Sequence, residues 1–181
     1  MKLTNDININ VKKLREELNL GKSFDVIERI IEVHNHKYYF YFLDGFVKDT
    51  NMEYVRRDIY NLDEKDFNSI KNATDLVEKA LCSIEASTES DIGNIITAIL
   101  CGQTAMLCEN FDEAVLLDYR TYPARGVEEP EKEKVLRGAH DGFVETIVFN
   151  TALIRRRIRD PHLTFEMHNI ADAEKYAEVK L

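Results

Sequence analysis

The sequence lacks any apolar run long enough to cross a membrane. The longest run, from Tyr38 to Leu43, falls far short of the roughly 20 residues that a membrane helix needs. Internal repeats and low-complexity tracts are also absent, and 44% of the residues are hydrophobic, which is typical of a globular protein. A chain of 181 residues should form one domain, or one domain plus a fragment of a second.

Motifs that carry catalysis are missing as well. The sequence contains no nucleophile elbow, no phosphate-binding Walker loop, no two-histidine helix motif and no closely spaced metal ligands. A hydrolase would have to use His140, Asp141 and the glutamates of a nearby loop as general acids or bases. Because glutamates in a loop are usually solvated, we expect no enzyme, no metal and no cofactor, and we keep a hydrolase as a remote alternative.

Cysteine and histidine are scarce, and neither forms a metal-binding pattern. The three cysteines, Cys82, Cys101 and Cys108, lie in apolar surroundings without metal-type spacing, which indicates buried thiols in a reducing compartment. His34 and His36 flank a turn without a third ligand nearby, so we interpret them as an exposed turn. His162 and His168 lie beside or on the last predicted strand, and nothing else marks them.

Positive charge is in deficit over most of the chain. The net charge of −9 argues against nucleic acid and against an anionic membrane surface as partners. The stretch from Arg120 to Pro161, called the basic stretch below, has nine Lys/Arg and seven Asp/Glu, a net charge of +2. The remainder therefore carries −11, and the basic stretch is the part suited to acidic groups.

The hydrophobic pattern predicts two β-hairpins and several amphipathic helices. One hairpin joins a strand within residues 23–33 to the two-sided apolar strand 38–43, and the other joins strands 104–109 and 114–119. A short strand is expected at 83–87 and another at 163–169. Helices are expected at 7–18, 50–62 and 63–70, after Thr74, and at 92–100 after a cap at Ser90 or Asp91. The predicted fold class is α/β (α+β mixed): a mixed β-sheet containing hairpins, covered by amphipathic helices.

The basic stretch has three parts. Residues 120–137 form a polar loop with Pro123 and Pro130, because a residue before proline is pushed out of the helical region. Gly138 and Gly142 then bracket a turn in which Asp141 is the predicted helix N-cap. The helix itself is predicted from Phe143 to Arg159 and is stopped by Pro161. Its predicted buried stripe comprises Val144, Ile147, Thr151, Ile154 and Ile158.

Opposite charges within the basic stretch suggest an interface. Four arginines crowd the end of the predicted helix, and arginine suits bidentate pairing with the acidic cluster of residues 128–133, within one chain or across to a neighbouring subunit. The alternative is that the arginines complement the helix dipole and stay solvated. The candidate interface residues are Glu128, Glu129, Glu131, Arg137, Asp141, Arg155, Arg156 and Arg157.

Long ungapped runs in the basic stretch carry a family resemblance. They are Val127-Glu128-Glu129-Pro130-Glu131, Lys134-Val135-Leu136-Arg137-Gly138, Asp141-Gly142-Phe143, and Asn150 to Ile158. Weaker similarity lies upstream at Arg15-Glu16-Glu17-Leu18, Ser23-Phe24-Asp25, Asp44-Gly45 and Asp118-Tyr119-Arg120. On these residues the chain resembles the A-subunit family of spore germinant receptors, and it is more similar to the stage V sporulation protein AF branch than to the nutrient-sensing branch.

The resemblance implies a function in spore germination. It implies that the chain is the soluble N-terminal domain of a membrane protein of the spore inner membrane, on the cytosolic (spore core) side. It further implies a homo-oligomer that acts with other germination proteins in assembly and signal coupling of an ion-releasing channel complex. The alternative is a sensor domain that binds a small-molecule nutrient in a cleft against a missing second lobe.

The C-terminal end departs from the family pattern. The resemblance predicts a glycine-rich, basic loop and a further strand there, but Ile170 runs directly into Ala171-Asp172. We therefore expect a domain at residues 1–170. Residues 171–181 are predicted to form a helix, as the start of a second subdomain after a missing segment.

Overall fold

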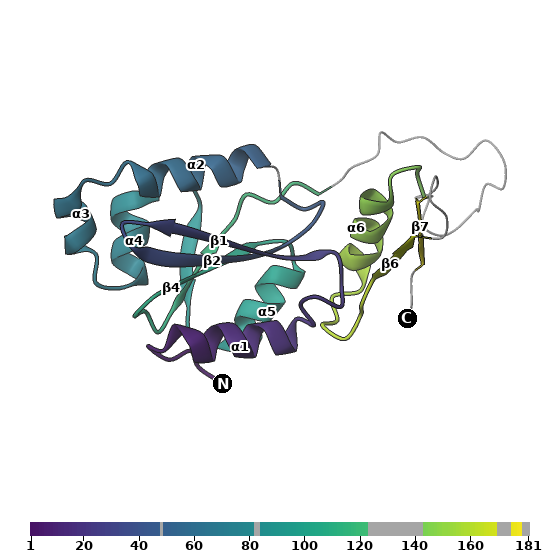
Figure 1. Cartoon of the computed structure of the whole chain (residues 1–181), viewed down its shortest axis with the longest axis horizontal. Helices are drawn as coiled ribbons and strands as arrows, with labels where there is room; N and C mark the ends of the chain where they lie inside the picture. Colours follow the sequence, from purple (N-terminus) through teal and green to yellow (C-terminus); the bar gives the residue numbers. More distant parts are fainter. Residues whose placement is uncertain (48, 82–83, 123–142, 170–174, 179–181) are drawn as a thin grey trace.

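A five-stranded antiparallel sheet forms the centre of the molecule (Figure 1). The computed structural model describes residues 1–47, 49–81, 84–122, 143–169 and 175–178. The sheet has the order β1-β2-β4-β5-β3 and every ladder is antiparallel, where the sequence predicted strands of mixed direction. Its strands are β1 (Val26–Val33), β2 (His36–Leu43), β3 (Ala86–Glu89), β4 (Thr104–Cys108) and β5 (Ala114–Leu117).

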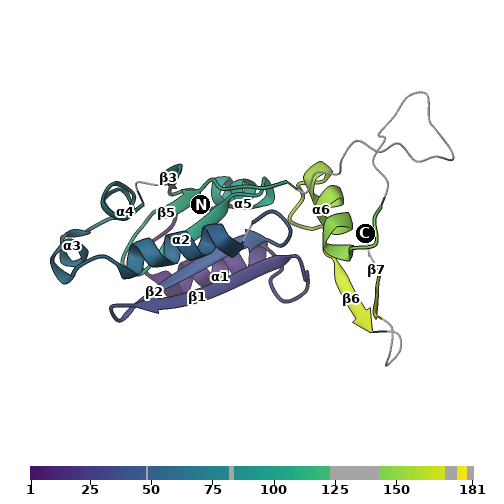
Figure 2. The ribbon, with the colours of Figure 1, turned by 90° about the horizontal axis from the view of Figure 1, so that it is seen from above.

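Helices cover both faces of this sheet, so the main body is a three-layer sandwich (Figures 1 and 2). One core contains the buried faces of α1 and α5, and the other contains those of α2 and α4. The predicted α/β fold class is confirmed. The helices are α1 (Ile7–Glu17), α2 (Asp49–Tyr60), α3 (Glu64–Ser69), α4 (Ala73–Ala80) and α5 (Ile92–Leu100).

The strand β2 separates the two cores. Tyr39 and Tyr41 point to the side of α1 and α5, whereas Phe40 and Phe42 point to the side of α2 and α4. Successive side chains of a strand face opposite ways, so a strand buried on both sides reads as a continuous apolar run. The predicted two-sided burial of residues 38–43 is therefore confirmed.

Local backbone chemistry explains where the hairpin and the helices begin. His34 and Asn35 both have positive φ, 52° and 63°, and form the two-residue turn between β1 and β2. Asp91 caps α5 by accepting from the Asn94 backbone N–H, as predicted. The predicted cap at Thr74 is wrong, because Asn72 accepts from the Asp75 backbone N–H, and the cap therefore lies two residues earlier.

A smaller unit extends from one end of the sandwich (Figures 1 and 2). It consists of α6 (Ile147–Arg157) and a two-stranded antiparallel ribbon of β6 (Glu166–Asn169) and β7 (Lys175–Glu178). The predicted strand near the C-terminus is thus present as β6. The predicted helix over residues 171–181 is wrong where the structure describes it, since pairing with β6 makes residues 175–178 a strand.

The helix α6 is shorter and differently oriented than its pattern predicted. It begins at Ile147 rather than Phe143, and its cap residue Thr146 makes no side-chain capping bond. Its buried residues are Thr151, Ala152 and Arg155, whereas Ile158 is 43% exposed because the backbone is already extended there. Of the predicted stripe, Thr151 is buried, Val144, Ile147 and Ile154 are half-buried, and only the prediction for Ile158 is wrong.

No helix in the described ranges combines the length and the apolar character needed to cross a bilayer.

Candidate functional site

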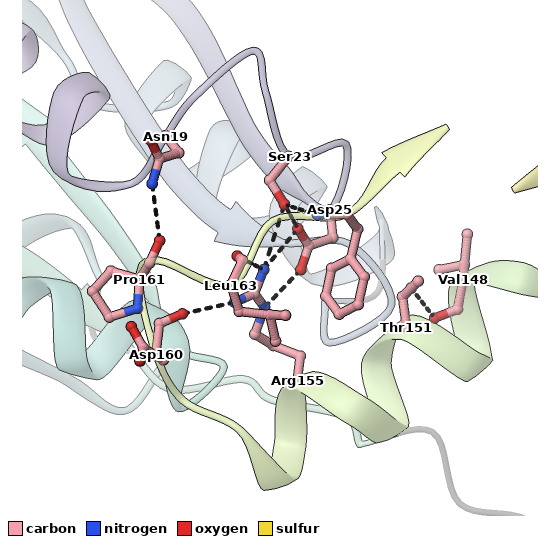
Figure 3. Close-up of polar contacts among 10 residues, drawn as sticks. Asn19, Ser23, Asp25, Val148, Thr151, Arg155, Asp160, Pro161 and Leu163 are labelled. Carbon is pink, nitrogen blue, oxygen red and sulfur yellow. Dashed lines mark hydrogen bonds and ion pairs between the residues drawn. The ribbon is translucent and has the colours of Figure 1, made fainter. Parts of the chain in front are cut away.

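The most unusual side chain of the molecule is a fully buried arginine on the inner face of α6. Arg155 is 1% exposed, and its guanidinium forms a two-point contact with the carboxylate of Asp25 at the start of β1. The Nε–Oδ2 and Nη2–Oδ1 distances are 2.8 and 3.1 Å (Figure 3). This fork geometry is the strong form of an arginine–carboxylate pair.

Backbone carbonyls use the remaining donors of Arg155. Its Nη1 donates to the carbonyl of Asp160 at 3.0 Å, and its Nη2 donates to that of Leu163 at 2.9 Å. Ser23 also belongs to this group, which we call the Arg155 cluster: its hydroxyl donates to Asp25 and accepts from the Phe165 backbone N–H at 2.9 Å. The cluster thus fixes the segment that follows α6 against the start of β1.

Burial makes this pair sensitive to the loss of either partner. Both side chains are almost inaccessible, at 1% for Arg155 and 3% for Asp25. A buried charge is tolerated only when it is paired and hydrogen-bonded, and removal of one partner leaves the other desolvated and uncompensated. The aromatic ring of Phe165, with its centroid 4.9 Å from Arg155 Cζ, adds a cation–π contact.

A glycine allows α6 to approach the sandwich closely. Gly45 follows β2 with φ of +80°, and a Cβ placed there would lie 3.0 Å from Val148 Cγ1 and 3.3 Å from Ala152 Cβ. Those distances are shorter than ordinary van der Waals contacts. The position therefore needs glycine for two reasons, its backbone conformation and the closeness of α6.

The outer side of α6 meets the segment that follows β5. Arg156 lies over the ring of Tyr122, with 4.8 Å between Cζ and the centroid. Tyr122 in turn packs on Phe46 and donates to the Cys101 carbonyl at 2.9 Å. Close by, burial would raise the pKa of Asp118, but hydrogen bonds from Arg120 and Gln103 outweigh it and hold that pKa below its usual range.

An asparagine side chain shapes the entry into α6. Asn150 accepts from the Val144 backbone N–H at 2.7 Å and donates to the Val144 carbonyl at 2.6 Å. Asn10 in α1 makes the same two contacts with the backbone of Thr4, also six residues earlier. In α6 this clamp holds residues 144–146 in a non-helical path, which accounts for the late start of the helix.

The predicted interface residues fall into three groups. Glu128, Glu129, Glu131, Arg137 and Asp141 lie outside the described residues, as do the whole acidic cluster and His140. Arg156 and Arg157 are exposed on α6. Arg155 is instead buried and forms an ion pair with Asp25. Its interpretation as a surface arginine, solvated or facing another subunit, is therefore wrong.

Sequence reasoning missed Asp25 and Ser23 as functional partners. The available signal was a pair of polar residues that alternates with Phe24 and Val26, just before a strand whose first residue is buried. A buried aspartate needs a cation, and the basic stretch supplies arginines. The pattern does not say which arginine, since Asp25 and Arg155 are 130 positions apart and their contact depends on the path of the chain between them.

Neither a metal site nor a hydrolytic centre emerges within the described ranges. There, no group of three or more His, Cys, Asp or Glu side chains is arranged to hold a metal. His34 and His36 instead place their rings 5.0 Å from that of Phe67. Burial raises the pKa of the Cys108 thiol, which favours the neutral, unreactive form.

The family model of the Bacillus/Clostridium GerA spore germination proteins matches residues 12–179. The chain belongs to the GerA family. It is 32% identical to the stage V sporulation protein AF of Bacillus subtilis (strain 168) over 92% of this chain and 34% of that protein. It is 30% identical to the spore germination protein GerLA of Bacillus cereus over 87% of this chain and 32% of that protein. The chain therefore spans about a third of the length of these relatives.

A solved structure confirms the fold of this GerA-family chain. The N-terminal domain of the A subunit of the Bacillus megaterium spore germinant receptor GerK3 is similar, with a TM-score of 0.73 and 18% sequence identity. The similarity covers 98% of this chain and 64% of that domain. The mixed helix and sheet architecture described above is thus the architecture of that domain.

Segments that carried the family resemblance meet around α6, although they are scattered along the sequence. Ser23-Phe24-Asp25 supplies the carboxylate for Arg155, and Gly45 supplies the close approach to α6. Arg120 lies 6.0 Å from the ring of Tyr122, on which Arg156 packs. The fold therefore brings these matching segments into one joint between the sandwich and α6.

Proposed function

We propose that this domain is a non-catalytic assembly and signal-coupling module of a spore germination membrane protein. The joint around Arg155 is the observation that carries the proposal. In this joint a buried ion pair, a glycine contact and an aromatic contact hold α6 in one orientation. Such a joint supports the transmission of position between two parts of a protein, because packed interfaces shift between discrete arrangements rather than deforming continuously.

The outer face of α6 supplies the assembly surface. Phe149 is 44% exposed and lies on the same helix as the exposed Arg156 and Arg157. Outside the basic stretch the chain is strongly acidic, with a net charge of −11. A second copy of this chain therefore offers complementary charge to α6, and complementary charge sets orientation and partner choice.

Membership of the GerA family supports a proposal for the role of the complete protein. In our proposal it forms a homo-oligomer at the spore inner membrane, with this domain on the core side, and couples a germination signal to an ion-releasing channel. The support is membership of the GerA family and the AF-type and receptor-type relatives. The membrane part would belong to the two thirds of the relatives' length that this chain does not span.

Sedimentation velocity over a concentration series tests the assembly surface. We expect the domain to self-associate and Arg157→Glu, which leaves the Arg156–Tyr122 contact in place, to remain monomeric with an unchanged circular dichroism spectrum. The matched control is Arg57→Glu, which reverses the charge of an exposed arginine on α2 and should associate like the wild type. Equal association of all three proteins would refute the assignment to α6.

A small-molecule sensor is the second candidate, and an open cleft favours it. Residues 21–24, Val26 and the strand β6 line an open cleft of about 540 Å³ at the boundary between the sandwich and the extension. A cleft at such a boundary is a common place for ligands. A saturable thermal shift with an amino acid or a sugar would favour this function, and a flat response would leave the assembly role.

A further inference from the structure

A separate cavity of about 160 Å³ lies at the end of the sandwich opposite α6. It is formed by the start of β2, the end of β4, the turn after β4 and the α3–α4 region. Its apolar wall consists of Phe67, Ile70, Leu76 and Phe111. It opens beside the start of β2, whereas α6 packs near the end of that strand, roughly 25 Å away at the rise of a β-strand. This cavity is thus distinct from the cleft beside β6.

The hydroxyl of Tyr38 is a polar group of this cavity that has no hydrogen-bond partner among the described residues. The side chain lines the cavity and is 4% exposed, yet within the described part of the chain its hydroxyl neither donates nor accepts a hydrogen bond. Burial, with Cys108 and Glu109 nearby, raises the pKa of Tyr38, so the group stays a protonated donor. Among the described residues, Thr104 Oγ1 is the fully buried side-chain atom without a partner, so the Tyr38 hydroxyl is accessible from the cavity and available to donate a hydrogen bond.

The charged groups at the rim balance one another. Lys71 and Glu109 both line the cavity and carry opposite charges. The Glu109 carboxylate already accepts from the Lys37 backbone N–H at 3.3 Å and lies 3.8 Å from the ring Nδ1 of His36. The rim therefore favours neither an anion nor a cation, and the apolar wall favours an uncharged body.

We propose that this cavity binds a small, neutral, single-ring molecule with one oxygen, which accepts a hydrogen bond from Tyr38. Cavities of about 150 Å³ lined by apolar side chains hold benzene, so the volume suits one ring. The aromatic wall of Phe67 and Phe111 suits a planar apolar body. The Tyr38 hydroxyl then gains the partner that it lacks. This site is independent of the assembly role proposed for α6.

Amide chemical-shift titrations with phenol and with toluene test the site. The two probes have similar size, but only phenol has an oxygen. We expect saturable shifts confined to residues around the cavity with both probes. Tyr38→Phe should weaken phenol binding by roughly 3- to 10-fold, as expected for one hydrogen bond, and leave toluene unchanged. Ile70→Trp should fill the cavity and abolish both.

Two results would overturn the proposal. One is the absence of saturable shifts up to about 10 mM phenol, an affinity too weak for a built site. The other is binding that survives Ile70→Trp in a folded protein, since the probe would then lie elsewhere. Should Ile70→Trp fail to fold, an equal effect of Tyr38→Phe on phenol and toluene would by itself exclude the hydrogen bond.

Discussion

Arg155 shows how one side chain can determine the placement of a whole helix. Its guanidinium donates to a carboxylate, a hydroxyl and two carbonyls that come from the residues just before β1 and from the segment after α6. The orientation of α6 is therefore set by polar geometry as well as by its small buried residues.

We predict that Arg155→Leu lowers the free energy of unfolding by about 3 to 5 kcal/mol, because it strands the buried Asp25 carboxylate. Urea unfolding followed by circular dichroism measures the change. Arg56→Leu, on the exposed face of α2, is the control and should cost less than about 1 kcal/mol. In the double variant Asp25→Leu/Arg155→Leu the loss should be smaller than the sum of the single losses. Additive losses would mean that the two charges do not depend on each other.

Gly45 provides a second test at the residue scale. Gly45→Ala should destabilise the protein more than Gly21→Ala, because both residues have positive φ but only Gly45 faces α6 within 4 Å. We expect a cost of about 1 to 2 kcal/mol from the left-handed backbone in each variant, with an added packing cost at Gly45 alone. Thermal unfolding measures both. Equal shifts in Tm would show that α6 accommodates the added methyl group at Gly45 without a packing cost.

At the scale of elements, an ion pair connects α1 to β1. Burial would raise the pKa of Glu28, but hydrogen bonds from Arg15 and Tyr41 outweigh it, so the pKa lies below its ordinary value. A carboxylate with a lowered folded-state pKa stabilises the protein above its unfolded pKa of about 4.3, and that contribution is lost as the pH falls through the folded value.

The wild type should therefore lose stability below about pH 4 more steeply than Glu28→Gln, which cannot ionise. Urea unfolding at a series of pH values gives both slopes. As a control, Glu32→Gln changes an exposed glutamate of the same strand and should keep the wild-type slope. Parallel curves for wild type and Glu28→Gln would show that this pair adds no pH dependence.

Elements with strong local patterns were predictable, and those set by distant contacts were not. The two-sided burial of residues 38–43 and the Asp91 cap follow from local chemistry, and both are confirmed. The strand at 175–178 could not be predicted because its β character comes from pairing with β6. The phase of α6 was wrong because an isolated pattern assigns arginine to the surface, whereas Asp25 draws Arg155 inside.

At the scale of the whole molecule, the two faces of α6 have different surroundings, and we propose different tasks for them. The inner face packs on the sandwich through Arg155 and Ala152, and the outer face carries exposed Phe149 and Arg157 beside the contact of Arg156 with Tyr122. Family membership could be inferred from the basic stretch, but the meeting of its segments with residues 23–25 and 45 needed the fold. The arrangement explains why an assembly role is favoured over chemistry.

Germination of spores that carry the full-length protein tests this account most directly. Spores with Arg157→Glu should germinate more slowly than spores with the Arg57→Glu control, at equal amounts of protein in the spore membrane fraction. The loss of optical density after addition of a germinant measures the rate. A slowed rate in the first variant alone is the predicted result. Wild-type germination by both variants would contradict the claim that the outer face of α6 serves assembly.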